Sequence, residues 1–334
     1  MRMFTLKVST AELPGSWDSL AGHYFQQRKF LEHAERYNPC GQRYYLCQEE
    51  DRVVSAAIVY TLRLDLLTYI NIKSPLKMHI VGIPCSVSCP GIFGDKEAVE
   101  ALKKHLIDQE KGFLLFLNMT EKPTDNVRSS GSTLPTIVLS NRFSDWNHYV
   151  ASLRSGYRRR LHQINVPDKM LQFVKTNCTG FSSQMYDQYL EVYKRSSGKL
   201  EKLSFDFFRN LPEEFILNVC YKNEQVIGWN LALESRKIYY FFLGGIDYKQ
   251  NRANNTYLRL LTQLVRGGIV RHVDFIELGQ TAEIAKMRMG GKPESLYMQA
   301  HHSNPFFQNL LKMASPMLTY KRKLECTNAL KQNA

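Results

Sequence analysis

The chain has 334 residues, of which 44% are hydrophobic and 22% are charged, a balance that excludes a wholly disordered, collagen-like or coiled-coil protein. Its length predicts about two domains, with enough residues to bury a sizeable core. Lysine and arginine number 44 against 31 acidic residues, so the formal net charge is +13. This charge favours an anionic partner, such as a nucleotide cofactor, nucleic acid or an anionic lipid surface, without choosing among them.

The sequence contains no run of about 18 apolar residues, so no transmembrane helix is expected, and its first residues lack the apolar core of a signal peptide. The seven cysteines are odd in number and irregularly spaced. Without a Cys-x-x-Cys pair they predict neither a disulfide framework nor a zinc ribbon, and His301 and His302 have no ligand partners at a recognisable spacing. We therefore expect no metal, a reducing compartment and a cytoplasmic protein.

In chain order, the first half opens with an amphipathic helical segment over residues 24–37 and a β-hairpin over 45–60. After a strand-rich region, Asp95 is the expected N-cap of a helix, and residues 113–119 have the apolar pattern of a buried strand. Residues 120–135 are rich in turn formers and predict an exposed loop.

The second half is expected to begin with a helix from about Ser144, whose aromatic and apolar residues recur at steps of three and four. Gly267 and Gly268 are predicted to end a later helix, and the basic, polar C-terminus from Lys321 is expected to be frayed. Between them the pattern predicts, in order, an amphipathic helical segment, a β-hairpin, a strand, a helix and a strand over residues 203–215, 218–233, 237–245, 257–265 and 273–279.

The two halves share one hairpin pattern. In each, a strand ends near a cysteine, a polar turn follows, and a second strand opens six residues later, as Cys47 leads to Val53 and Cys220 leads to Val226. The offset between the cysteines is 173 residues (220 − 47). We interpret this as two copies of one α/β unit, although any two hairpins share part of such a pattern.

The most informative stretch is a strand, a polar loop and a helix over residues 241–265. A strand that feeds a helix through a short loop leaves backbone N–H groups unpaired at the helix start, and these groups with the helix dipole form an anion site. Lys249 and Arg252 add positive charge beside it, which suits a pyrophosphate. The alternative is an ordinary turn in which Asn254 or Asn255 caps the helix.

This loop resembles the pyrophosphate loop of the GNAT superfamily, Gln/Arg-x-x-Gly-x-Gly/Ala, with Gln250, Ala253 and Asn255 at the matching positions. Ala253 and Asn255 stand where the family has residues that allow close approach of the backbone. The order of helix, hairpin, strand, loop, helix and strand also matches. The resemblance implies acyl-coenzyme A as the donor substrate, bound by Lys249, Gln250, Arg252, Ala253, Asn254 and Asn255.

A second motif resembles the FemAB-like and BioF2-like branch of the same superfamily, in which a glycine at a strand end precedes a Lys-x-Arg pair and a further glycine. Ile284 and Ala285 occupy the place of the aromatic residue that usually comes before the lysine. Residues 152–163 resemble the basic helix that opens the second lobe in that branch. The motif residues are Gly279, Lys286, Arg288 and Gly290.

Two tandem GNAT lobes are typical of that branch, so the resemblance covers most of the chain. It implies an α/β protein of the α+β type, in which each lobe is a twisted mixed sheet flanked by helices. We expect an N-terminal lobe over residues 1–140 and a C-terminal lobe over 141–334. Because Asp95 occupies the place of a phosphate in the first lobe, that lobe is expected to be structural or to help bind the acceptor, and the second to bind the donor.

In this family an amine attacks an activated acyl carbonyl directly, which requires positioning, deprotonation of the amine and stabilisation of charge on the carbonyl oxygen. Glu277 and Glu283 are the candidate bases. Tyr240 is a candidate proton donor to the leaving group, as are Tyr239 and Tyr297. The residues expected to bind substrate are Gln280, Thr281, Lys286, Arg288, Arg158 and Arg159. Each also has an ordinary alternative role, as a surface charge, a solvated helix face or a packed aromatic ring.

The expected function is therefore transfer of an acyl group from acyl-coenzyme A to a small-molecule, cell-wall or lipid amine, in a cleft between the lobes. One alternative is an aminoacyl-tRNA-dependent transferase of the Fem type, with which the basic charge agrees, although the sequence has no long charged heptad segment for a helical arm. The other alternative is a non-catalytic scaffold that binds nucleic acid or a protein.

Overall fold

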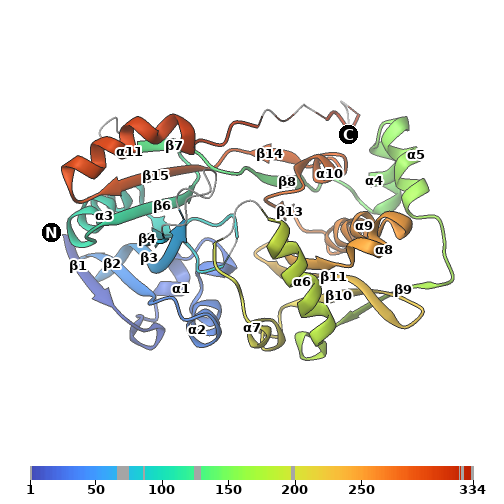
Figure 1. The fold of residues 1–334 in the computed structure, drawn as a ribbon, viewed down its shortest axis with the longest axis horizontal. Coiled ribbons are helices and arrows are strands. Elements are labelled where there is room, and N and C mark those ends of the chain that lie inside the picture. The colour runs from blue at the N-terminus through green and yellow to red at the C-terminus, as the bar shows by residue number, and fades with distance from the viewer. Residues whose placement is uncertain are drawn as a thin grey trace. The chain divides into compact units, whose positions relative to one another are not determined.

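The computed structural model describes residues 2–65, 75–85, 87–123, 129–196, 200–322, 324 and 327–331 (Figure 1). The chain forms two compact units, each built from more than one stretch of sequence. Because residues 136–140 belong to unit 2 and residues 295–321 to unit 1, the units differ from contiguous lobes over 1–140 and 141–334. Unit 1 comprises Met1–Leu134, Leu200–Ser204 and Ser295–Lys321, and unit 2 comprises Pro135–Lys199, Phe205–Glu294 and Arg322–Ala334.

Unit 1 is a mixed sheet with helices on both faces. Its strands follow the order β1-β2-β3-β4-β6-β15-β7, with β5 paired to β3, and among these strands β4 and β6 form the parallel pair. The strands are β1 (Arg2–Lys7), β2 (Arg43–Glu49), β3 (Arg52–Asp65), β4 (Pro75–Val81), β5 (Ile92–Gly94), β6 (Phe113–Met119), β7 (Ser129–Ser132) and β15 (Tyr297–His302). The α-helices are α1 (Trp17–Leu20), α2 (Arg28–Tyr37), α3 (Lys96–Gln109) and α11 (Pro305–Leu318), and short 3-10 turns cover Thr10–Glu12 and Tyr24–Gln26.

Unit 2 has the same architecture. Its strands follow the order β14-β8-β13-β12-β11-β10-β9, and β12 and β13 form its parallel pair. The strands are β8 (Thr136–Ser140), β9 (Leu171–Thr176), β10 (Ile216–Lys222), β11 (Gln225–Ser235), β12 (Ile238–Ile246), β13 (Phe275–Gly279) and β14 (Lys292–Glu294). The helices are α4 (Trp146–Ser152), α5 (Ser155–Ile164), α6 (Ser183–Arg195), α7 (Phe205–Arg209), α8 (Tyr248–Asn254), α9 (Thr256–Val270) and α10 (Glu283–Met287), with a 3-10 turn over Cys178–Gly180.

Apart from β5, the two sheets have the same order of strands. The sixth strand of each, counted from β1 and from β9, comes from the other half of the sequence. β8 follows the strands of unit 1 along the chain but pairs with β13 of unit 2. β15 follows the strands of unit 2 but pairs with β6 of unit 1. We call this arrangement the strand exchange. The predicted α/β fold with two mixed sheets is confirmed.

The predicted repeat is confirmed at the level of single residues. In the β2–β3 hairpin Cys47 is the register partner of Ser55, and a bulge follows between Cys47 and Gln48. In the β10–β11 hairpin Cys220 is the partner of Gly228, and a bulge follows at the same place. Because a bulge needs one extra residue in one strand only, its recurrence after the matching cysteine indicates duplication more strongly than the hairpins themselves do.

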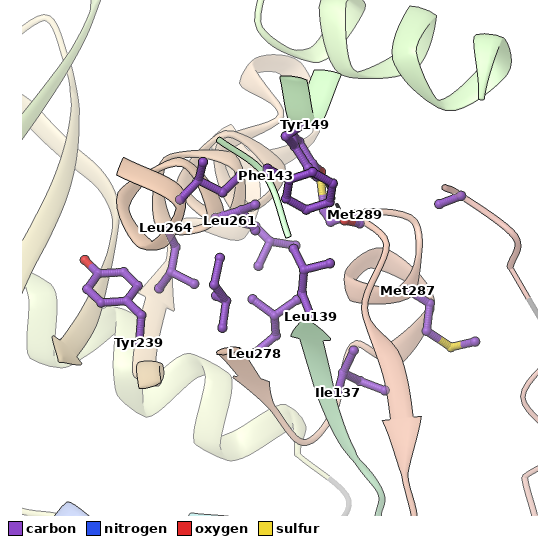
Figure 2. Close-up of a cluster of buried hydrophobic side chains, with 14 of the residues drawn as sticks. Ile137, Leu139, Phe143, Tyr149, Tyr239, Leu261, Leu264, Leu278, Met287 and Met289 are labelled. Carbon is purple, nitrogen blue, oxygen red and sulfur yellow. Dashed lines mark hydrogen bonds between the residues drawn. The ribbon is translucent and has the colours of Figure 1, made fainter. Parts of the chain in front are cut away.

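The larger hydrophobic cluster of unit 2 lies between α9, α4 and one face of the sheet (Figure 2). Ile137 and Leu139 of the exchanged strand β8 are at its centre, beside Leu278 of β13. Burial of side chains of this size stabilises the fold by roughly 1.5–3 kcal/mol each. In unit 1 the corresponding cluster lies between α3 and the face of the sheet that carries Leu114 and Phe116.

The expected end of α9 at Gly267 and Gly268 is wrong, because the helix continues to Val270. A Cβ atom on Gly268 would lie 2.6 Å from a side-chain carbon of Ile276, and one on Gly267 would lie 3.2 Å from the Tyr239 hydroxyl. The two glycines therefore let the helix approach the sheet closely, which is a packing role that the sequence pattern alone does not distinguish from a helix end.

Three other expectations need correction. The helix expected from Ser144 is two helices, because the buried Leu153 between α4 and α5 is extended and bridges to Leu330. That bridge also holds part of the C-terminus that was expected to be frayed, since the Arg154 amide donates to Ala329 at 2.9 Å. The expected loop over residues 120–135 contains β7, and its residues 124–128 lie outside the described part of the chain.

None of the helices within the described ranges combines the length and the apolar character that crossing a membrane requires.

Candidate active site

The parallel strands β12 and β13 of unit 2 pair for only part of their length. They are in register from Ile238 and Phe275 to Tyr240 and Glu277. Beyond these residues β12 continues along β11 to Ile246, while β13 continues along β8 to Gly279. The sheet therefore divides after Tyr240 and Glu277, and the parallel ladder of hydrogen bonds stops there. We call this place the split.

Four polar side chains share one face of the sheet at the split. Tyr240 is the register partner of Glu277, which in turn faces Val138 of β8, while Thr136 faces Glu294 of β14. Register partners, and residues two apart in a strand, lie on the same face. The Thr136 hydroxyl donates to Glu277 Oε1 at 3.3 Å. Burial, followed by the charge of Glu277, raises the pKa of Glu294.

A buried lysine occupies the split itself. Lys286 of α10 is 1% exposed, and its Nζ donates to the carbonyl oxygens of Gly279 at 3.1 Å and Gln280 at 2.5 Å. The same nitrogen lies 5.2 Å from the ring centroid of Phe241. Because Gly279 ends β13 and Phe241 is the first residue of β12 past the paired region, the ammonium group lies between the two strands. Burial lowers the pKa of Lys286 to about 7, against the opposing effects of Glu283 and then Glu277.

The turn that leads into α10 has an unusual backbone. Gly279, Thr281 and Ala282 have φ angles of +71°, +60° and +48°. Left-handed conformations cost non-glycine residues about 1–2 kcal/mol each, and such strain is characteristic of functional turns. The two hydrogen bonds from Lys286 tie this turn to the helix that follows it, so Lys286 also has a structural role.

The other predicted residues of this segment lie less deeply in the site. The Glu283 carboxylate is buried and pairs with Arg322 at 3.3 Å, so it is engaged in an ion pair within unit 2. Gln280 is half-buried and places its carbonyl against Lys286, while Thr281 and Arg288 are exposed. The structure therefore brings together Glu277, Tyr240, Lys286 and Gln280.

The sequence predicts a polar loop before α9. This prediction is wrong, because residues 248–254 form the helix α8. The Asp247 carboxylate caps this helix by accepting from the amides of Lys249 at 2.8 Å and Gln250 at 3.3 Å. The Asn251 side chain accepts from the Tyr257 amide at 2.9 Å, in the first turn of α9. Amides that a pyrophosphate loop would offer to a ligand are therefore bonded to the chain itself, although Lys249, Arg252 and Ala253 are exposed or half-buried beside them.

Asn254 and Asn255 of the same segment have structural contacts. The buried Asn254 accepts from Lys222 Nζ at 3.0 Å and donates to the carbonyl oxygen of Gln250 at 2.9 Å. Asn255 joins the two helices in a left-handed conformation with φ of +50°. Asparagine tolerates that conformation better than most residues, which explains how the chain continues from α8 into α9 without a glycine.

The basic residues of α5 separate into two groups. The half-buried Arg158 donates to the carbonyl oxygens of Leu153 at 3.3 Å and Ala151 at 3.4 Å, so it caps the end of α4. Arg154, Arg159 and Arg160 are exposed. The other tyrosines named from the sequence belong elsewhere: Tyr239 packs against the glycines of α9, and Tyr297 is part of β15 in unit 1.

The sequence did not identify two residues of the site. Thr136 and Glu294 meet Glu277 through the strands β8 and β14, which flank one another only because of the strand exchange. No local spacing links residues 136, 277 and 294, so no motif could have indicated this group. Among the described residues there is also no cluster of three or more His, Cys, Asp or Glu side chains placed to hold a metal ion.

The two mixed sheets with one strand order and one parallel pair each are similar to solved structures of the tandem GNAT fold, as the resemblance in sequence implied. No family model and no curated protein matches the chain, but solved structures do. The structure of FemX matches with a TM-score of 0.54 and 10% identity, over 93% of this chain and 100% of that one.

Two further structures match with a TM-score of 0.51. The tandem GNAT protein from the clavulanic acid biosynthesis pathway is 10% identical over 91% of this chain and 99% of its own. L-PGS from Bacillus licheniformis is 11% identical over 88% of this chain and 94% of its own. At these identities the likeness establishes the fold that the chains share.

Proposed function

We propose that the protein is a transferase that moves an acyl or aminoacyl group from an activated donor to an amine, with the donor carbonyl placed at the split in unit 2. The observation that carries this proposal is the position of the buried Lys286 amino group between β12 and β13, at the place where Tyr240, Glu277 and Glu294 share one face of the sheet. The site supplies an amino group with a pKa of about 7, two carboxylates and a phenol within one unit, which are the types of group that amide formation from an ester or thioester requires.

In the proposed reaction the amine nitrogen attacks the donor carbonyl carbon, and a C–N bond forms as the carbonyl π electrons move to oxygen. Glu277, paired with Glu294, accepts the proton that the amine loses. Lys286 stabilises the negative charge on the oxygen. The tetrahedral intermediate then expels the thiolate or alkoxide of the donor, which takes a proton from Tyr240. The raised pKa of Glu294 indicates that this carboxyl pair holds a proton more readily than an isolated carboxylate does.

Two donors remain candidates. Acyl-coenzyme A is supported by the GNAT fold and by the positive charge of Lys249 and Arg252 at α8. Aminoacyl-tRNA is supported by the helical form of residues 248–254, because Asp247 and Asn251 already bond the amides that would bind a pyrophosphate. Unit 1 would be structural or contribute to acceptor binding, since its parallel ladder ends one residue pair later than that of unit 2, at the apolar residues Val81 and Phe116.

The test is a transfer assay on the full chain with two labelled donor pools, acyl-coenzyme A and charged tRNA, and a mixture of amine acceptors. We expect label to move from one pool. Lys286→Met should lose transfer by about 100-fold or more, as removal of an oxyanion-stabilising donor does, while Lys237→Met, which changes an exposed lysine of the same unit, should not. Transfer from neither pool, or equal rates in both variants, would contradict the proposal.

A further inference from the structure

Helix α11 of unit 1 turns large apolar side chains toward solvent. Phe306, Phe307, Leu310 and Met313 are 67%, 43%, 46% and 79% exposed. Steps of three and four residues place them on one side of the helix, and we call this surface the α11 stripe. Of the twelve large hydrophobic side chains that are exposed among the described residues, four belong to this helix, so the stripe is a patch and not the scatter of single residues that every surface shows.

The other side of α11 covers an apolar cavity. Figure 1 shows the helix beside β7 and β15. Between it and the sheet lies a small apolar cavity of about 80 Å³. The cavity and the stripe adjoin one another, because the ring centroids of Phe113 in the cavity and Phe307 in the stripe are 6.5 Å apart. The apolar side chains that line the cavity include Met78, Phe113, Leu115, Met298 and Leu311.

The segment of unit 1 that contains this helix carries charge of one sign. From Ser295 to Lys321 the sequence contains no aspartate or glutamate, and it carries the exposed Lys312 and Lys321. A second copy of the chain would bring another net charge of +13 to the surface, whereas an anionic lipid surface would be attracted to it. The combination of an apolar stripe, an adjoining apolar cavity and basic flanks is the pattern of a helix that lies in a membrane interface.

We propose that unit 1 docks on an anionic phospholipid membrane through the α11 stripe, and that the small cavity beside the stripe admits the end of a lipid acyl chain. The proposal does not depend on the transfer reaction, because it uses no residue of the split. It adds a location for the substrate: an acceptor or donor carried in the same membrane would meet the enzyme at its surface.

The experiment is flotation of the full chain with vesicles of phosphatidylcholine alone and of phosphatidylcholine with phosphatidylglycerol. We expect binding to the vesicles that contain phosphatidylglycerol, and a loss of roughly tenfold or more in the double variant Phe306→Ser/Met313→Ser. These two side chains are the most exposed of the stripe, so their replacement should leave thermal unfolding unchanged. The matched control is Val166→Ser/Met170→Ser, which removes two apolar side chains that are 56% and 52% exposed in unit 2 and should retain binding.

Sedimentation of the same proteins without lipid tests the remaining alternative, which is a dimer in solution. If the wild type fails to float with either vesicle, or if the double variant binds as the wild type does, the proposal is overturned. A dimer in solution that dissociates in the double variant, without vesicle binding, would assign the stripe to contact between copies of the chain instead.

Discussion

The two sheets follow one strand order but differ where their parallel strands end. In unit 1, β4 and β6 stay in register to the last residue of β4, where Val81 pairs with Phe116. In unit 2 the matching residues are Phe241 and Leu278, which lie beyond the last pair of β12 and β13. The parallel strands have equivalent neighbouring strands in both sheets, so the order of the strands does not cause the split.

The residues at the place where the two parallel pairs begin to differ are apolar in unit 1 and polar in unit 2. The hairpin registers align Ile80 and Leu115 of unit 1 with Tyr240 and Glu277 of unit 2. An apolar pair is stabilised when the sheet closes over it, whereas a tyrosine and a carboxylate need polar partners or water. One copy of the scaffold therefore ends its parallel ladder at apolar residues, and the other places polar groups where its ladder ends.

Replacing one residue of each pair by glutamine gives the largest expected effect on the transfer rate. Glu277→Gln should lower the transfer rate by about 10²–10⁴-fold, because the amide cannot accept a proton. Leu115→Gln at the matching place in unit 1 should lower stability instead, since it adds a polar group to an apolar strand, while the rate per folded molecule is retained. The measurements are initial rates and thermal unfolding on both variants, and a rate loss in Leu115→Gln as large as that in Glu277→Gln would remove the distinction between the units.

The buried polar network of unit 1 should affect stability alone. Both Glu110 oxygens accept from Arg43 at 3.0 Å, and Tyr45 donates to Glu110 at 2.8 Å. We expect Glu110→Leu to lower the free energy of unfolding by about 2–3 kcal/mol, at the low end for a broken buried pair because Arg43 keeps some exposure. Denaturant unfolding and the transfer assay check this together. A variant that keeps its stability but loses activity would place a functional site in unit 1.

The pH dependence of stability should report on Lys286. Below pH of about 7 the lysine is protonated in the folded and the unfolded chain, and between there and its ordinary pKa of 10.5 only the unfolded chain binds the proton. Unfolding then takes up a proton, so stability rises with pH by at most about 1.4 kcal/mol per unit. The free energy of unfolding of the wild type should therefore increase relative to Lys286→Met between pH of about 7 and 9. A constant difference across this range would show that the pKa of Lys286 is not lowered.

The smallest expected effect comes from replacing two glycines with a left-handed backbone, one in each unit. The comparison distinguishes a loss of stability through backbone strain from a change in the transfer rate. Gly279 has a φ of +71° at the split, and Gly112 has a φ of +87° in unit 1, where a Cβ atom would have no other atom within 4 Å. Alanine at either place should cost about 1–2 kcal/mol of stability, because both conformations are left-handed. Only Gly279→Ala should also change the transfer rate, since its carbonyl oxygen holds Lys286. Equal rates in the two variants would show that the turn does not position the lysine.

Local patterns were sufficient for most elements. Residues 113–119 form the strand expected from an unbroken apolar run, and the cysteine-anchored hairpins lie in register as their alternation predicts. The pattern failed where a residue is used for packing: Gly267 and Gly268 have the composition of a helix end, but their missing side chains admit Tyr239 and Ile276. It also failed at residues 248–254, because a polar segment capped by Asp247 has no apolar stripe to mark it as a helix.

Sequence reasoning identified some residues of the candidate site and missed others. Glu277, Lys286 and Gln280 lie within ten residues of one another, so a single motif contains them. Thr136 and Glu294 reach the same place along strands from distant parts of the chain. That meeting depends on tertiary pairing, which leaves no periodic signal in a single sequence.

The strand exchange also constrains how the chain matures. A ribosome that has finished residues 1–134 has made every strand of the first sheet except β15, so the edge of β6 stays without its neighbour until synthesis has passed residue 302. An uncovered apolar edge is a template for aggregation. The first-made unit therefore has to wait for the last-made strand, and severing the gene at residue 140 would leave two fragments that each hold a strand belonging to the other.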